Sequence, residues 1–141
     1  MLISSDELAT QGFWRAGTVY PDPVTTLRVD MARDTHGFVV YLMVVDGEVM
    51  KAGRTETPLK KRMHSTFASL RNKMTTHADH PRYQEQTFKQ HAQATIIAGH
   101  HVELWAREYA SRAEMMAAED ALNRHYRGLW TKEGRSYPAR R

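Results

Sequence analysis

The chain contains no cysteine among its 141 residues. This absence excludes disulfide bonds, zinc sites built on thiolates and cysteine nucleophiles, and it fits a protein of a reducing compartment. No apolar run approaches the roughly 20 residues needed to cross a bilayer. The opening MLISSDELATQ carries early acids in place of the apolar core of a signal peptide. We therefore expect a soluble, cytoplasmic protein with no membrane partner.

Positive charge is in excess, because 20 lysine and arginine residues face 16 aspartate and glutamate residues, a formal net charge of +4. A basic surface attracts polyanions, and phosphate backbones are the obvious class. With 41% hydrophobic residues, the length suits one domain with one core. We divide the chain into an N-terminal arm (residues 1–36), one domain (37–130) and a C-terminal tail (131–141).

Three strands are predicted within this domain. Residues 38–45, FVVYLMVV, form a continuous apolar, β-branched run that is typical of a buried strand. Asp46-Gly47 suits a tight hairpin, and residues 48–53 return as a second strand. Residues 102–106 alternate apolar and polar side chains, which predicts a third strand of one antiparallel sheet.

Three helices are predicted beside the strands. The first follows Pro58 and ends near Asn72, the second runs over residues 83–97, and the third follows the capping box Ser111-Arg112-Ala113-Glu114. The expected fold is therefore α/β (α+β), with a small three-stranded antiparallel sheet flanked by helices. Residues 1–36 combine a short helical signal with turn chemistry, and we expect an irregular arm there.

The motifs within residues 37–127 follow a recognisable order. Val39-Val40-Tyr41 lies in the first strand, Lys51-Ala52-Gly53-Arg54-Thr55 closes the hairpin, Leu59-Lys60-Lys61-Arg62 opens the next helix, and Glu119 lies in a later helix. This order resembles the GIY-YIG nuclease family, which keeps its metal-binding glutamate in that later helix. Two motifs depart from the family's pattern. Val39-Val40 stand in place of Gly-Ile, and Lys51 replaces the tyrosine of the second motif, a variant that recurs in the wider superfamily.

The resemblance implies a metal-dependent endonuclease that cleaves phosphodiester bonds in DNA, most naturally duplex DNA. Tyr41 would help to deprotonate the attacking water, which needs a phenol pKa below the usual value of about 10 or a concerted transfer. Lys51, Arg62 and a metal would favour the phenolate, and Arg62 would also stabilise charge on the phosphate. Glu119 would hold one Mg2+ or Mn2+ ion. His64 would contact phosphate or take part in proton transfer.

The predicted site therefore has two parts. The predicted catalytic residues are Tyr41, Lys51, Arg62, His64 and Glu119, with Glu119 as the metal ligand. The predicted nucleic-acid contacts are Gly53, Arg54, Thr55, Lys60, Lys61, Arg71 and Lys73.

Simpler interpretations of these residues stay open. Tyr41 in an apolar strand is by default a core aromatic, and a run of lysine and arginine is by default a solvated helix face. Glu119 shares its helix with two rival carboxylates, Glu114 and Asp120. The chain is alternatively a nucleic-acid-binding module that has lost catalysis, which Lys51 favours, or a protein-interaction domain with an acidic partner.

Specificity and biological role are not determined by these residues. A homodimer or higher homo-oligomer is one route to specificity, and insertion of residues 75–90 into a DNA groove is another. The family includes phage-encoded, restriction and mobile-element enzymes, and we expect a role of the phage or restriction type.

Overall fold

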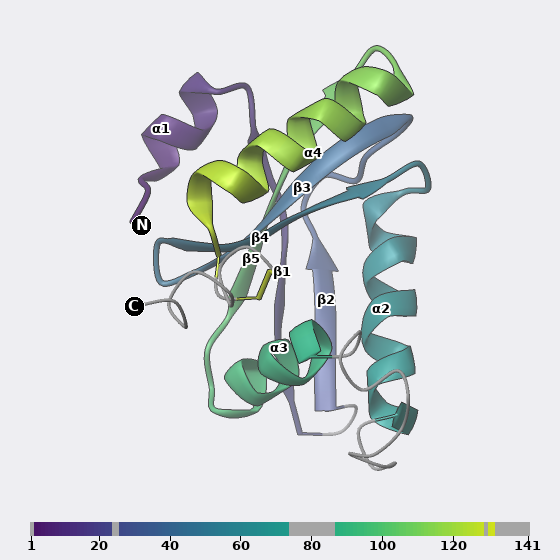
Figure 1. Ribbon diagram of the computed structural model, residues 1–141. Helices are drawn as coiled ribbons and strands as arrows, with labels where there is room; N and C mark the ends of the chain where they lie inside the picture. Colours follow the sequence, from purple (N-terminus) through teal and green to yellow (C-terminus); the bar gives the residue numbers. More distant parts are fainter. Residues whose placement is uncertain (1, 24–25, 74–86, 129, 132–141) are drawn as a thin grey trace.

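The computed structural model contains a five-stranded antiparallel sheet with helices packed on both faces (Figure 1). In chain order the elements are α1 (Ser5–Thr10), β1 (Trp14–Asp22), β2 (Thr26–Met31), β3 (Phe38–Val45), β4 (Glu48–Thr55), α2 (Leu59–Lys73), α3 (Thr87–Ile97), β5 (Val102–Tyr109) and α4 (Arg112–Tyr126). The strands lie in the order β2-β1-β5-β3-β4. The two edges of the sheet are therefore β2 and β4.

The structure describes residues 2–23, 26–73, 87–128 and 130–131, and for residues 26, 68–73, 87–90 and 93 it describes the backbone alone. The side chains of Arg71 and Lys73 lie outside the described residues, as do most of the predicted tail and of the segment 75–90. Across the described ranges, no helix combines the length and the apolar character that crossing a membrane requires.

The sheet has five strands, so the predicted number of three was wrong. The two additional strands, β1 and β2, come from the segment that we expected to be an irregular arm. In β2, Leu27 and Val29 are buried alternately with exposed residues, the pattern of a half-buried strand. In β1 this alternation is interrupted, because the register with β5 shifts between Arg15 and Gly17. A bulge of this kind removes the periodic signal that sequence analysis depends on.

The order and type of the later elements were predicted correctly. In the turn between β3 and β4, Asp46 and Gly47 have φ angles of 51° and 78°, both positive as a tight type I′ hairpin requires. The capping box of α4 is also confirmed. The Ser111 side chain accepts a hydrogen bond from Glu114 N–H, and the Glu114 carboxylate accepts one from Ala110 N–H.

Two core clusters lie on opposite faces of the sheet. The first contains side chains of α2 and α3, and we call this side the α2 face. The second contains side chains of α1 and α4, and we call it the α4 face. Successive residues of β3 alternate between the faces, with Tyr41 on the α2 face and Val40 and Leu42 on the α4 face. This burial on both sides explains why β3 is a continuous apolar run.

Candidate active site

The ring of Tyr41 lies over Gly53, its directly paired residue on the edge strand β4. A Cβ atom added at Gly53 would lie 2.7 Å from Cε2 of Tyr41 and closer still to Cζ and Oη, distances that real Cβ atoms essentially never show. Glycine is needed here because any side chain would occupy the volume of the ring. Since β4 is the outer strand, the phenol is directed toward the edge of the sheet.

Tyr41 is 3% exposed, and burial raises the pKa of its phenol above the usual range. The Arg62 guanidinium lowers this pKa through its charge and a hydrogen bond, and the Glu119 carboxylate raises it, but burial has the largest effect. Arg62 therefore acts in the direction that we expected without producing a phenolate. Concerted proton transfer is the route that a phenol with a raised pKa favours.

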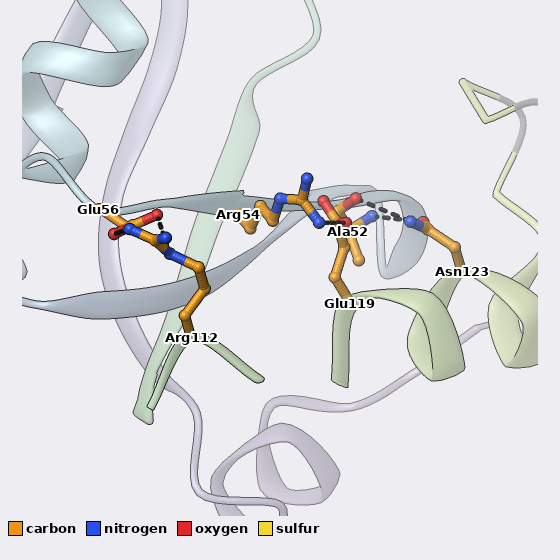
Figure 2. Close-up of polar contacts among 6 residues, drawn as sticks. All are labelled: Ala52, Arg54, Glu56, Arg112, Glu119 and Asn123. Carbon is orange, nitrogen blue, oxygen red and sulfur yellow. Dashed lines mark hydrogen bonds and ion pairs between the residues drawn. The ribbon is translucent and has the colours of Figure 1, made fainter. Parts of the chain in front are cut away.

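Glu119 reaches the same edge from α4, on the opposite face of the sheet. Its Oε1 atom lies 3.5 Å from Nη1 of Arg54, and the two side chains are 23% and 45% exposed (Figure 2). Arg62 and Glu119 both act on the pKa of the Tyr41 phenol, and Glu119 also pairs with Arg54, so interactions link side chains of β3, β4, α2 and α4 at this edge. We call these four residues, Tyr41, Arg54, Arg62 and Glu119, the edge cluster.

The two rival carboxylates of α4 have other partners. Glu114 belongs to the capping box at the start of the helix. Asp120 lies 3.2 Å from Arg124, one turn further along the same helix, and both side chains are exposed. Of these three acids, the one carboxylate that acts on the Tyr41 phenol is Glu119.

The outer side of β4 is bonded to α4 and to the residues that follow it. Asn123 makes two hydrogen bonds with the main chain of Ala52, each 3.0 Å long. Two residues earlier in the strand, Met50 O accepts a hydrogen bond of 3.1 Å from Trp130 N–H. Trp130 is buried in the core of the α2 face. The chain therefore passes from α4, on one face, around the edge of the sheet to the other face.

Lys51 and Thr55 flank this place on β4. Lys51 is paired with Met43, a residue of the α2 face, and is half-buried, so it shares the face of Gly53 and Tyr41. The hydroxyl of Thr55 is buried and accepts a hydrogen bond from Thr57 N–H, 3.1 Å away. Thr55 thus orders the turn that leads from β4 into α2.

His64 and Lys60 lie on a different side of α2 from Arg62. Together with residues at the end of β1 and along β2, including Arg28 and Asp30, they line a groove of about 520 Å³. Two residues along an α-helix correspond to a rotation of about 200° around its axis, so Arg62 and His64 project from nearly opposite sides of α2. Lys61 is exposed on the same helix. The structure therefore brings Tyr41, Arg54, Arg62 and Glu119 together and leaves Lys60 and His64 in the groove beside β2.

Two positioning features of α2 were missed by the sequence analysis. The side chain of Thr35 accepts a hydrogen bond from Leu59 N–H at 3.1 Å, and Asp34 accepts one from Lys60 N–H at 3.1 Å. Thr35 is fully buried. These acceptors cap the start of α2 and hold the helix that carries Arg62. They lie 24 and 26 residues away in sequence, so no local capping pattern predicts them.

The donors at the edge cluster fit a hard divalent cation shared with a phosphate. No group of three or more histidine, aspartate or glutamate residues that suits a metal is found in the described part of the chain. Mg2+ is commonly held by one or two carboxylates, with water and phosphate oxygens as the other ligands. Glu119, a partly exposed carboxylate whose charge acts on the Tyr41 phenol, fits the role of the single carboxylate at such a site.

No family model and no curated protein matches this chain. Among solved structures, a mutant of bacteriophage T4 EndoII aligns over 89% of this chain and 97% of its own, with a TM-score of 0.65 and 17% sequence identity. The restriction endonuclease HPY188I, in complex with product DNA, aligns over 89% of this chain and 88% of its own, with a TM-score of 0.48 and 17% identity. The first of these similarities shows that the chain has the same fold as EndoII.

Proposed function

We propose that this protein is an endonuclease of the GIY-YIG type that hydrolyses phosphodiester bonds in DNA. The observation that carries the proposal is the edge cluster, in which an arginine on one face of the sheet and a carboxylate on the other both act on the pKa of a buried phenol. Perturbed pKa values beside a charged partner are typical of catalytic sites. The fold shared with the endonuclease EndoII and the net positive charge both support a nuclease that acts on DNA.

Arg62 is the group that we assign to the phosphate. Hydrolysis needs stabilisation of the charge that develops on the phosphoryl oxygens. The guanidinium of Arg62 stays protonated at any working pH and offers a planar fork of donors, which suits two phosphate oxygens. Lys51 lies on the same face of the sheet as the Tyr41 phenol and adds a positive point charge there. Arg54, now paired with Glu119, is placed to bind a phosphate when a cation takes up that carboxylate.

Tyr41 acts as a neutral phenol in this scheme. Its raised pKa leaves the proton on Oη at neutral pH. A proton of the attacking water moves to Oη while the phenolic proton moves to a phosphate oxygen, so no phenolate is formed. The water oxygen bonds to phosphorus and the bond to the leaving oxygen breaks. Burial of the phenol fixes its position for this transfer.

Glu119 would hold the Mg2+ or Mn2+ ion, which when bound supplies positive charge at the leaving oxygen. The carboxylate now interacts with Arg54 at 3.5 Å, and this pair is partly exposed. A partly exposed ion pair is weak, so Arg54 gives way at little cost.

The alternative is a DNA-binding module without catalysis. Two observations favour it. Arg54 already pairs with the carboxylate that the proposed cation would use, and Lys51 stands where the family has a tyrosine. Both functions require DNA to bind, so cleavage is the property that separates them.

The experiment is a nicking assay on supercoiled plasmid with Mg2+ or Mn2+, and with EDTA as the metal-free control. The test variant is Glu119→Gln, which keeps the shape of the side chain and removes its charge. Asp120→Asn, the neighbouring carboxylate on the same helix, is the matched control. We expect the control to cleave normally and Glu119→Gln to lose activity by about 100-fold or more. If the wild type binds DNA in a salt-dependent way but cleaves no duplex, single strand or RNA, the binding module is correct.

A further inference from the structure

Asn123 joins α4 to the outer side of the edge strand (Figure 2). Its Oδ1 atom accepts a hydrogen bond from Ala52 N–H, and its Nδ2 atom donates one to Ala52 O, each at 3.0 Å. These are the two main-chain groups that a further strand would bind at this edge. One side-chain amide therefore replaces a neighbouring strand at this position.

These two hydrogen bonds determine which residues of α4 stand beside which residues of β4. Glu119 lies four residues before Asn123, a rise of about 6 Å along a helix. Arg54 lies two residues after Ala52, an advance of about 7 Å along a strand. Because the two steps match, a helix with Asn123 at Ala52 brings Glu119 to Arg54, where their side chains are 3.5 Å apart.

We infer that Asn123 is a positioning residue, which sets the register of α4 along β4 and so holds the Glu119 carboxylate in the edge cluster. The inference rests on the proposed function, since it concerns the metal-binding role of Glu119. The Arg54 pair is partly exposed and holds Glu119 only weakly. The bonds of Asn123 are part-buried and engage both groups of one residue, so they restrain the helix more strongly.

The test uses the full chain, 15N-labelled, with two variants of Asn123. Asn123→Ala removes both hydrogen bonds. Asn123→Asp keeps the volume and the acceptor for Ala52 N–H but removes the donor, so it separates hydrogen bonding from packing. Gln11→Ala is the control, because the Gln11 side chain donates a hydrogen bond of 3.2 Å to Tyr126, which is on α4 and not on β4.

Mn2+ alone is the probe, followed by paramagnetic broadening of the amide signals of Glu119 and Arg54. We expect the Mn2+ concentration for half-broadening to rise by about tenfold or more in both Asn123 variants and to stay unchanged in Gln11→Ala. On plasmid DNA, kcat should fall with KM nearly unchanged, because ground-state contacts with DNA are retained. Faster exchange of the Ala52 amide in Asn123→Ala would confirm that the bonds are lost.

The outcomes separate this inference from the proposed function. If Ala52 exchanges faster in Asn123→Ala while Mn2+ binding and kcat match the control, Asn123 is merely structural and the inference is overturned. If the wild type itself neither binds Mn2+ at Glu119 nor cleaves DNA, the proposed function and the inference both fail.

Discussion

Replacing Gly53 with alanine places a methyl group where the ring of Tyr41 lies. The added Cβ would be 2.7 Å from Cε2, whereas an ordinary contact begins at 3.4 Å, so the ring must retreat by at least 0.7 Å. Gly53 does not have the positive φ that disfavours side chains, so the effect comes from the contact and not from backbone strain. Tyr41 is buried, and its ring is rigid, which leaves little room for this movement.

Two magnitudes follow for Gly53→Ala. Overpacking of a core costs about 1–3 kcal/mol of unfolding free energy. A misplacement of about 1 Å at a catalytic group lowers the rate by about 100-fold, so we expect a fall in kcat of between about 10-fold and 100-fold. Chemical denaturation measures the first quantity, and single-turnover nicking of plasmid measures the second.

The control is Gly53→Ala in a Tyr41→Val background, where no ring lies over the strand. There the alanine should be neutral or stabilising by about 0.5–1 kcal/mol, because glycine weakens a strand interior. An equal loss of stability in both backgrounds would refute the clash with the ring. So would a Gly53→Ala protein that is as stable and active as the wild type.

Three further predictions concern the groups around the phenol. Because the pKa of Tyr41 is raised in the folded state, this residue contributes stability that is present below about pH 10 and is lost as pH rises through the folded pKa. Above pH 10, the unfolding free energy of Tyr41→Phe should therefore decline less steeply than that of the wild type, by up to about 1.4 kcal/mol per pH unit. Arg54→Ala should weaken DNA binding and reduce the slope of log affinity against log salt by about one, while denaturation shows a loss below about 1 kcal/mol; an unchanged slope would argue against a phosphate contact. Thr35→Val leaves the buried Leu59 N–H without its acceptor and should cost about 1–3 kcal/mol in chemical denaturation, unless α2 begins elsewhere.

Several features of the site could be read from local patterns. The apolar run of β3, the turn at Asp46-Gly47 and the capping box of α4 each depend on residues close in sequence, and all three are confirmed. The residues of the edge cluster were also predicted, because the resemblance to a family supplied their order. The position of Glu119 among three acids on one helix came from that order alone, and the geometry now distinguishes it from its neighbours.

Other features depend on contacts between distant residues. β1 lies between β2 and β5, and residues 14–22 show no periodic pattern that predicts a strand at this position. The hydrogen bond between Asn123 and Ala52 joins residues 71 positions apart in sequence. The start of α2 is capped by Thr35, which lies in the loop between β2 and β3. A lone asparagine on a helix carries no signal of such a partner, because its hydrogen bonds are defined only once the helix packs against the strand.

The sequence by itself determined the type and order of the later elements, the positive charge and the set of residues that we propose for phosphodiester cleavage. Only the tertiary structure decided in which direction the pKa of the Tyr41 phenol shifts and which basic side chain of α2 acts on it. Burial raises the pKa of Tyr41 by more than the Arg62 guanidinium lowers it, and burial is a property of the whole fold. Arg62 and His64, two residues apart, are separated because they project from different sides of α2, one toward the phenol of Tyr41 and the other toward β2.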